Sequence, residues 1–373
     1  MKITIIQGAF YPVPSLKGTS VEKFWYELGA DLVERGHQVV HISRRHPSLP
    51  NIEFSRGVKY KRIRSFDSPK LHVVRIFLDL LYSCNALFQL PSADIIVSNT
   101  FWFPILALIR SRKTGKLMVS VDRMPRGQFK FYRAASSFRV PSMAVLNAIM
   151  NESVVAGSKC KLIPNPLPFI SSLPPSPVDK KNVILYVGRI HPEKGIETLL
   201  AAYQLACKRG LSNWSLRIIG PSDTAFGGGG PKWQASLENL FRSTDYPVEW
   251  VGPIYDNSSL QKQFAESSIF VYPSLVGAGE ALPVAPLEAM AQGSVPIVSG
   301  LDCFKDYITD GLNGLIFMHG VSSVNNLSDA IFKLASDNDL RQKMAQKALE
   351  VRVSHSSPRI ASMLEAAFLE LLS

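Results

Sequence analysis

The sequence has few cysteines, no long hydrophobic run and a shortage of acidic residues, and each of these excludes a class of protein. Cysteine occurs four times in 373 residues, at Cys84, Cys160, Cys207 and Cys303, and never as a C-x-x-C pair. This spacing argues against a zinc ribbon or a disulfide framework and is typical of a reducing cytosol. We expect all four to be small buried hydrophobic side chains.

The sequence also contains no stretch that reads as a membrane-crossing segment. Its first residues, MKITIIQGAFYPVP, hold an apolar run of about five residues, which is typical of a buried strand rather than a signal peptide. The longest apolar stretch, residues 73–90, is interrupted by Arg75, Asp79 and Asn85 among others. It is too polar for a spanning helix. We therefore expect a cytoplasmic protein, either free or peripheral on the inner face of the cytoplasmic membrane.

Acidic residues are outnumbered, 30 against 41 basic ones, so the formal net charge is +11. The basic residues concentrate in the first half of the chain. Such a field attracts phosphates, whether of a nucleic acid, an anionic lipid or a nucleotide. No helix-turn-helix, RNA-recognition or zinc-finger signature accompanies it, so nucleic acid is the least favoured partner. A scattered, solvated basic surface is the alternative.

Strands and helices alternate along the chain in two successive series. The first includes a strand at residues 2–7, a helix at 20–35 and a strand at 37–42. Residues 164–178 then contain six prolines, which cannot continue a helix or a central strand. A second series begins with a strand at residues 182–187. We predict an α/β protein of two domains, with a ligand bound at the carboxyl ends of parallel strands.

Two segments of the second series carry groups suited to a charged, hydroxylated ligand. In the first, Glu280 and Glu288 lie eight positions apart across a strand–loop–helix junction. Carboxylates at such places can accept hydrogen bonds from sugar and ribose hydroxyls, and the helix start attracts an anion. In the second, Gly188 permits close approach of the backbone, while Arg189 and Lys194 can clamp a diphosphate. The alternatives are solvated carboxylates and a helix-entry loop with surface cations.

Several segments together resemble the large retaining glycosyltransferase family four. They are Y-V-G-R-I-H-P-E-K-G at 186–195, the E-x7-E spacing within E-A-L-P-V-A-P-L-E-A-M-A at 280–291, I-P-N at 163–165, G-T-S-V-E-K at 18–23, E-R-G-H-Q-V at 34–39 and V-Y-P-S at 271–274. The segments occur in the family's order, and the resemblance covers nearly the whole chain.

The resemblance implies the GT-B fold, in which two Rossmann-like domains face a central cleft and the C-terminal helix returns to the N-terminal domain. It implies an acceptor-binding domain at 1–165, a linker at 166–181, a nucleotide-sugar-binding domain at 182–355 and the returning helix at 356–373. The implied activity is retaining transfer of a hexose from a nucleotide-diphosphate sugar, of UDP or GDP type, to a saccharide, free or lipid-linked. The implied context is synthesis of cell-surface polysaccharide or glycolipid.

The resemblance also assigns roles to residues. Arg189 and Lys194 hold the donor diphosphate, Glu288 binds the ribose and Glu280 contacts the transferred sugar. The amide of Gly18 touches the diphosphate, and the remaining donor-binding positions are Gly188, Ala281, Leu282, Pro283 and Val284. Neither a cofactor nor a metal ion is expected, because cations and helix N-termini neutralise the leaving group.

The chain departs from the family pattern at three positions. Lys17 precedes Gly18 where relatives have two glycines, and Pro283 replaces a frequent glycine, which removes one N–H from the donor loop. Asp122 stands where many relatives carry a histidine close to the reacting sugar. We expect Asp122 near the reaction centre, where it orients a hydroxyl, marks altered chemistry or marks lost activity. The alternatives to a transferase are a non-catalytic nucleotide-sugar-binding or scaffold subunit and a GT-B epimerase or phosphorylase.

Three other segments bear on partners. Asp337-Asn338-Asp339 is a D-x-D but lies between predicted helices, so we expect no metal there. The glycine run at 227–230 lacks the G-x-x-x-x-G-K-[ST] order of a phosphate-binding loop and is interpreted as a lid or an insertion. The apolar segment 71–82 is predicted to be a buried helix of the first domain. The alternative is a helix resting on an anionic membrane surface.

Overall fold

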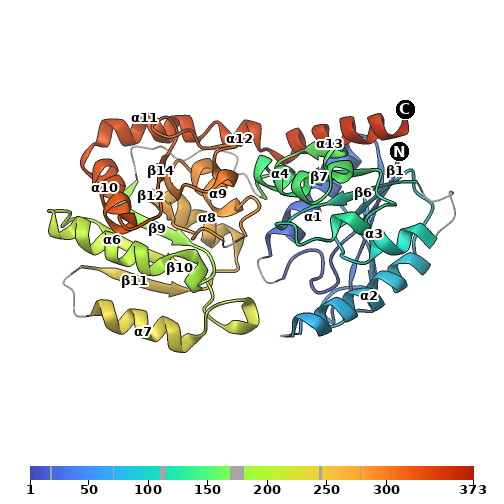
Figure 1. The fold of residues 1–373 in the computed structure, drawn as a ribbon, viewed down its shortest axis with the longest axis horizontal. Helices are drawn as coiled ribbons and strands as arrows, with labels where there is room; N and C mark the ends of the chain where they lie inside the picture. Colours follow the sequence, from blue (N-terminus) through green and yellow to red (C-terminus); the bar gives the residue numbers. More distant parts are fainter. Residues whose placement is uncertain (17–18, 70, 110–114, 169–179, 243–245, 278) are drawn as a thin grey trace. The chain divides into compact units, whose positions relative to one another are not determined.

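A computed structural model of the chain describes residues 1–16, 19–69, 71–109, 115–168, 180–242, 246–277 and 279–373. The chain folds into two compact units (Figure 1). Unit 1 comprises Met1–Pro168 and His355–Ser373, and unit 2 comprises Phe169–Ser354. The predicted contact of Gly18 and most of the predicted linker at 166–181 lie outside the described residues.

Unit 1 is built on a sheet in the order β3-β4-β2-β1-β5-β6-β7-β8, parallel except for the β3–β4 hairpin. Its strands are β1 (Lys2–Ile6), β2 (Gln38–Arg44), β3 (Ile52–Ser55), β4 (Val58–Ile63), β5 (Ile95–Ser98), β6 (Lys116–Ser120), β7 (Ser137–Val140) and β8 (Cys160–Leu162). Its helices are α1 (Ser20–Glu34), α2 (His72–Phe88), α3 (Phe103–Leu106), α4 (Met143–Glu152), α5 (Val154–Gly157) and α13 (Ser357–Leu372), with 3₁₀ turns η1 (Ala107–Ile109) and η2 (Phe129–Phe131).

The core of unit 1 joins residues from the two ends of the chain. Phe24, Trp25 and Leu28 of α1 pack with Ile360, Leu364 and Phe368 of α13, all nearly inaccessible to solvent. Both helices carry apolar residues at helical spacing, so each has one apolar face to bury. The hydroxyl of Ser357, the first residue of α13, also hydrogen-bonds the buried carboxylate of Asp31. The last helix is thereby attached to unit 1.

Unit 2 contains a six-stranded parallel sheet in the order β11-β10-β9-β12-β13-β14. Its strands are β9 (Lys181–Val187), β10 (Ser215–Ile219), β11 (Val248–Gly252), β12 (Ser267–Tyr272), β13 (Val295–Ser299) and β14 (Leu315–Phe317). Its helices are α6 (Ile196–Lys208), α7 (Pro231–Arg242), α8 (Asn257–Glu266), α9 (Val284–Ala291), α10 (Ser323–Ser336), α11 (Asn338–Ala348) and α12 (Val351–Ser354), with 3₁₀ turns η4 (Pro192–Lys194), η5 (Thr224–Phe226) and η6 (Asp302–Phe304).

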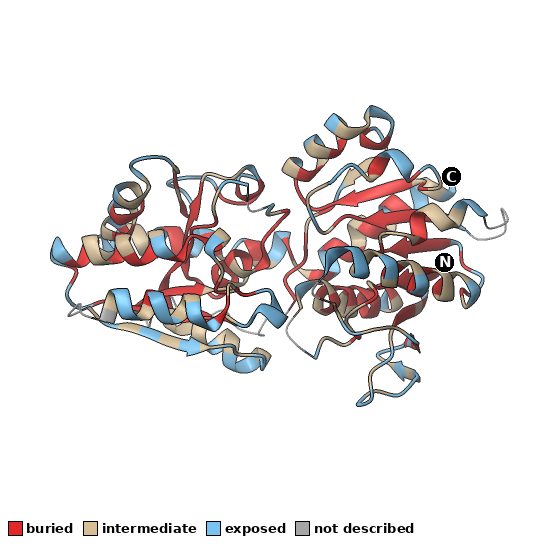
Figure 2. Ribbon diagram, turned by 60° about the horizontal axis from the view of Figure 1, so that its bottom comes forward, coloured by how far each residue is buried: buried red, intermediate tan, exposed pale blue. Residues whose placement is uncertain are grey.

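In each unit most of the strands are buried and the helices cover the sheet with one side facing solvent (Figure 2). Strands β12 and β13 are buried at every position, because helices lie on both faces of a parallel sheet. In the part of the chain that the structure describes, no helix is both long enough and apolar enough to span a bilayer.

Candidate active site

The candidate site lies where two neighbouring strands of unit 2 end. Strands β9 and β12 are parallel and adjacent, so the loops that follow them emerge at the same edge of the sheet. The first loop carries Arg189 and Lys194, and the second carries Glu280. Gly195 allows the two loops to touch: its φ is +69°, and a Cβ there would lie 2.1 Å from the carbonyl oxygen of Pro273.

Lys194 and Glu280 form an ion pair across the two loops. The Nζ of Lys194 lies 2.5 Å from Oε1 of Glu280, and both side chains are largely shielded from solvent, at 7% and 12% exposed. A hydrogen bond between opposite charges is stronger than a neutral one, and partial burial reduces its screening by water. Two residues predicted to touch the donor diphosphate and the transferred sugar are therefore in direct contact.

The same oxygen of Glu280 accepts two further hydrogen bonds. Ser274 Oγ donates at 2.7 Å and the Tyr272 hydroxyl at 3.2 Å. Burial and the nearby charge of Glu280 raise the pKa of Tyr272 well above its ordinary value, so its hydroxyl remains a donor at neutral pH. Three donors thus hold one carboxylate oxygen of Glu280 in place.

Arg189 is held beside Lys194 by a shared acidic neighbour. Its Nη2 lies 2.6 Å from Oε1 of Glu193, and Nζ of Lys194 lies 3.9 Å from the same oxygen. The other guanidinium nitrogen, Nη1, donates to the carbonyl oxygen of Gly227 at 2.5 Å. The two predicted phosphate-binding cations therefore both lie within 4 Å of a single carboxylate oxygen.

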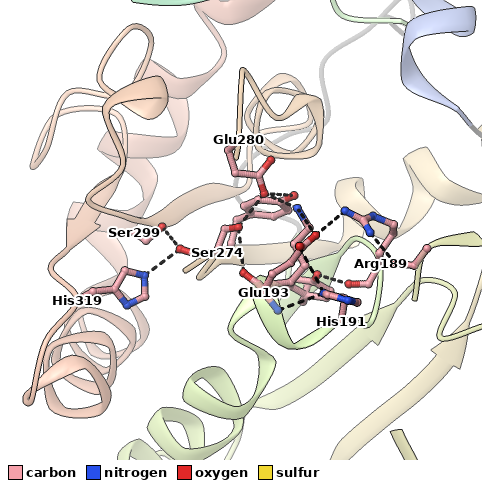
Figure 3. Close-up of polar contacts among 11 residues, drawn as sticks. Arg189, His191, Glu193, Ser274, Glu280, Ser299 and His319 are labelled. Carbon is pink, nitrogen blue, oxygen red and sulfur yellow. Dashed lines mark hydrogen bonds and ion pairs between the residues drawn. The ribbon is translucent and has the colours of Figure 1, made fainter. Parts of the chain in front are cut away.

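Two side chains donate hydrogen bonds to the carbonyl group of Ser274 (Figure 3). It accepts hydrogen bonds from Ser299 Oγ at 2.7 Å and from His319 Nε2 at 2.9 Å. The next residue, Leu275, donates its N–H to the carbonyl of Glu193 at 2.9 Å. The loop that carries Glu280 is thus hydrogen-bonded to β13, to His319 two residues after β14, and to η4.

Sequence reasoning assigned no role to Ser274, Ser299, His319 or Glu193. Ser274 lies in the V-Y-P-S segment and Glu193 in the Y-V-G-R-I-H-P-E-K-G segment, so both fell within the segments that carried the family resemblance. Ser299 and His319 had no signal, because they meet Ser274 only through the order of the strands.

The glycine run at 227–230 borders the Arg189 loop. Gly227 accepts from Arg189, and Gly229 donates its N–H to the carbonyl of Ile190 at 2.8 Å. A Cβ on Gly228 would lie 2.2 Å from the backbone of Ser222, so the close approach requires glycine. In the structure this run is hydrogen-bonded to the segment that bears the cations.

The other predicted donor-binding residues form the entry to α9. Ala281, Leu282 and Val284 are buried, so a ligand would meet their backbone groups rather than their side chains. Pro283 precedes the first residue of α9 and donates no N–H. Glu288 is the fifth residue of that helix and is partly exposed. Gly188 lies against Tyr186, whose hydroxyl would be 2.8 Å from a Cβ at that position.

Asp122 belongs to unit 1, whereas Arg189, Lys194 and Glu280 belong to unit 2. It follows β6, and its Oδ1 accepts from Nη1 of Arg139 at 2.8 Å. Nη2 of the same arginine donates to Oδ1 of Asn165 at 2.7 Å. Burial raises the pKa of Asp122, although Arg139 opposes the shift. Sequence reasoning missed this buried ion pair, which joins neighbouring strands.

A second buried carboxylate of unit 1 lies near Asp122. Glu22 of α1 accepts from Nε2 of Gln7 at 3.3 Å. Burial is the main cause of the raised pKa of Glu22, and the charge of Asp122 adds to it. In the described parts of the chain no three His, Cys, Asp or Glu residues are grouped so that they could hold a metal ion. Asp337, in the D-x-D segment, instead accepts from the N–H of Leu340 at the start of α11.

The chain is similar to known proteins over parts of its length. Residues 174–351 match the family described as Glycosyl transferases group 1. An exopolysaccharide phosphotransferase of Streptomyces coelicolor is 28% identical over 58% of this chain and 21% of its own length. A phosphatidyl-myo-inositol mannosyltransferase of Mycolicibacterium smegmatis is 23% identical over 70% of this chain and 63% of its own. The chain spans less than two thirds of the length of the curated relatives it matches.

Solved structures show the fold. A sucrose-phosphate synthase of Thermosynechococcus elongatus superimposes with a TM-score of 0.80 at 20% identity, covering 99% of this chain and 98% of that one. Other structures, with TM-scores of 0.69 to 0.71, hold UDP. The predicted GT-B fold is confirmed.

Proposed function

We propose that this chain, whose residues 174–351 match the family described as Glycosyl transferases group 1, is a metal-independent, retaining hexosyltransferase. Its donor is a nucleotide-diphosphate sugar, and its acceptor is a saccharide, free or lipid-linked, of a cell-surface polysaccharide or glycolipid. We place this activity at the inner face of the cytoplasmic membrane. The observation that carries the proposal is the convergence of Arg189 and Lys194 on one oxygen of Glu193, with Lys194 also bound to Glu280.

The proposed chemistry follows from this arrangement. A diphosphate competes with Glu193 for the two cations, which neutralise the charge that develops on the leaving nucleotide. Glu280 binds hydroxyls of the transferred sugar, and Glu288 binds the ribose. The acceptor oxygen bonds to the anomeric carbon on the face that the phosphate leaves, and the acceptor proton passes to the departing phosphate oxygen. Configuration is retained without a protein nucleophile.

Nucleotide binding is tested by thermal shift with UDP, GDP, ADP, TDP and CDP and their sugar derivatives. A ligand at about one hundred times its dissociation constant stabilises the fold by about 2.7 kcal/mol. We expect one nucleotide to stabilise the wild type and to lose this effect in Arg189→Ala. The matched control is Arg209→Ala, because the Arg209 side chain is equally exposed, at 40% against 41%. Equal losses in the two variants would contradict the proposed clamp.

Transfer itself is tested with the nucleotide that binds. We expect release of the free nucleotide diphosphate only when an acceptor is present, and no change in rate on addition of EDTA. The anomeric configuration of the product, read by NMR, should match that of the donor. Loss of activity in EDTA or an inverted product would refute the metal-independent or the retaining part of the proposal.

A second candidate function is favoured by one observation. Asp122 aligns with a position at which, by the family resemblance, many relatives carry histidine, and it is paired with the buried Arg139. A non-catalytic nucleotide-sugar-binding subunit would bind the donor through unit 2 without turnover. In an active enzyme, Asp122→Ala should lower turnover while the nucleotide-dependent thermal shift stays unchanged. Donor binding by the wild type without transfer or hydrolysis would favour the subunit, and formation of a free epimerised donor would favour an epimerase.

A further inference from the structure

The net positive charge of the chain belongs entirely to unit 1. This unit holds 25 of the 41 basic residues and 12 of the 30 acidic ones, which gives it a formal charge of +13. Unit 2, which carries Arg189 and Lys194, holds the other 16 basic and 18 acidic residues and has a formal charge of −2. A field of one sign around a binding surface attracts ligands of the opposite sign. Unit 1 is therefore suited to an anionic ligand of its own.

The arginines at the carboxyl edge of the unit 1 sheet differ in how they are paired. Strands β1, β2, β4, β5, β6 and β7 are parallel, so the segments that follow them emerge at one edge, where such sheets bind ligands. Arg139 of β7 is paired with Asp122. Arg75, in the first turn of α2, and Arg123, three residues after β6, form no ion pair with a carboxylate among the residues that the structure describes.

Arg75 is held beside the segment that follows β1. Its Cζ atom lies 5.2 Å from the centre of the Phe10 ring, and its Nη2 donates to Oγ of Ser68 at 2.6 Å. The carbonyl oxygen of Phe10 accepts from Nη1 of Arg44 at 2.9 Å, which attaches the same segment to the end of β2. A guanidinium carries five N–H donors, so the bond to Ser68 leaves several of them for a ligand.

Arg123 lies close enough to Arg75 for the two positive charges to repel each other. Burial and the charge of Arg75 lower the pKa of Arg123. Tyr11 also lies within reach of the Arg123 charge, and Tyr11 directly follows Phe10, whose ring Arg75 covers. Both arginines therefore border the segment that follows β1. The Arg123 residue as a whole is exposed to solvent, so a ligand can reach it. We call Arg75 and Arg123 the unit 1 arginine pair.

The carboxylates that act on Arg123 are weak counter-ions. They are those of Glu22 and Asp122. Asp122 is already paired with Arg139. Glu22 is buried on α1, and burial is the main cause of its raised pKa, which favours its uncharged form. Within the described part of unit 1, the positive charge of the arginine pair is thus poorly compensated. An anion bound between two such like charges would relieve their repulsion.

We propose that the unit 1 arginine pair binds an oxyanion of the acceptor, a phosphate or a carboxylate carried by the saccharide that receives the sugar. Arginine suits this task, because its planar guanidinium donates two parallel hydrogen bonds to such a group. The assignment to the acceptor rests on the proposed transferase function, in which the donor diphosphate has its own cations in unit 2, Arg189 and Lys194. The acceptor is accordingly an anionic saccharide, and its neutral counterpart is a poor substrate.

The test measures binding to the full chain without any nucleotide sugar. Inorganic phosphate, glucose 6-phosphate, glucuronate and glucose are titrated by isothermal titration calorimetry at low ionic strength. We expect the anionic compounds to bind and glucose not to bind. Tighter binding of glucose 6-phosphate than of glucuronate would identify the recognised group as a phosphate, and the reverse order would identify a carboxylate.

Variants locate the binding. Arg75→Gln and Arg123→Gln should each weaken anion binding at least about ten-fold, the usual effect of losing a hydrogen bond to a charged group. Arg123→Lys keeps the charge without the planar fork and should recover part of the affinity. The matched control is Arg359→Gln, which removes one positive charge from an exposed arginine of unit 1 and should change the affinity by less than about two-fold. Circular dichroism and thermal unfolding show that each variant is folded.

The titrations are repeated on Arg189→Ala, because the cations of unit 2 also attract phosphate. We expect binding to persist in Arg189→Ala. Loss of binding in Arg189→Ala but not in Arg123→Gln would place the anion in unit 2 and overturn the proposal. Equal affinities of Arg123→Gln and Arg359→Gln, or no binding of any anionic compound to the wild type, would also overturn it.

The outcome is separable from that of the proposed function. The nucleotide-dependent thermal shift should be the same in Arg123→Gln as in the wild type, and transfer assays should show a raised KM for the acceptor with an unchanged KM for the donor. A nucleotide shift without anion binding would overturn this inference alone. Anion binding without a shift from any nucleotide would overturn the proposed donor and leave the anion site in unit 1 standing.

Discussion

The ammonium group of Lys194 and the carboxylate of Glu280 are in direct contact, 2.5 Å apart, although 86 positions separate them in the sequence. The contact joins the loop after β9 to the loop after β12. It places the residue proposed to bind the diphosphate beside the residue proposed to bind the sugar. The residue proposed to hold the diphosphate and the residue proposed to hold the sugar therefore act as a pair.

Replacement of Lys194 should impair turnover far more than replacement of a surface lysine. We expect Lys194→Ala to reduce kcat about 10² to 10³-fold, the usual effect of removing one donor to a developing charge. The control is Lys305→Ala, in which an exposed lysine paired with Asp302 is lost. Its effect should stay within about two-fold, as for most surface substitutions. Steady-state kinetics give kcat for both variants. Equal reductions of kcat would show that Lys194 has no special role in turnover.

Ser274 should act as a positioning residue for Glu280. Ser274→Ala removes one of three hydrogen bonds to Oε1 of Glu280 and should cost about 1 kcal/mol of stability. If the role is to position the sugar-binding carboxylate, KM for the donor or kcat should change beyond what this small destabilisation explains. Ser274→Thr keeps the hydroxyl and should recover most of the activity. Unchanged kinetics in Ser274→Ala would make the contact purely structural.

Gly195 should tolerate no side chain. Its φ is +69°, and a Cβ would lie 2.1 Å from the carbonyl oxygen of Pro273. Gly311 is the matched control in unit 2, because its φ is +76° and a Cβ there meets no atom within 4 Å. Both alanine variants incur the left-handed backbone cost of about 1 kcal/mol. Only Gly195→Ala adds a collision with the backbone, so urea denaturation should show a clearly larger loss for it than for Gly311→Ala.

Asp79 should make stability depend on pH. Burial raises its pKa from 3.8 to about 6, so the folded state holds this proton more tightly than the unfolded state. The contribution of Asp79 to stability is therefore greatest below pH 4, falls as the pH rises to about 6, and changes by about 3 kcal/mol in all. Asp79→Asn can keep an acceptor oxygen toward Ser83, Phe101 and Trp102 and removes the titration.

Comparison of Asp79→Asn with wild type separates the titration of Asp79 from that of other groups. Buried His41, whose pKa is lowered to about 3, titrates in an overlapping range with the opposite sign, but it is present in both. Urea denaturation at pH 4 and pH 7 measures the free energy of unfolding. The value for Asp79→Asn, relative to that for wild type, should be higher at pH 7 than at pH 4. Parallel stability profiles across this range would show that Asp79 is not the titrating group.

The local sequence was sufficient to predict several helices and strands, and to predict that the second domain binds a phosphate-containing ligand. Apolar residues at helical spacing predicted α1 and α13, and short apolar runs predicted the central strands β9 and β12, because these patterns follow from the geometry of a single element. Arg189 and Lys194 also fall within a single loop. Their types and spacing were enough to predict phosphate binding before any tertiary contact was known.

What only the tertiary structure decided is which distant residues meet. Lys194 touches Glu280, and Ser299 and His319 touch Ser274, because β9, β12, β13 and β14 lie in that order in the sheet. Asp122 meets Arg139 because β6 and β7 are neighbours. A periodic pattern predicts that the apolar face of a helix is buried, and α2 departs from this rule. The segment 71–82 was predicted to be a buried helix, but its apolar residues Val73 and Phe77 face solvent. The side that is buried carries Asp79, which accepts hydrogen bonds from the backbone of residues 101 and 102.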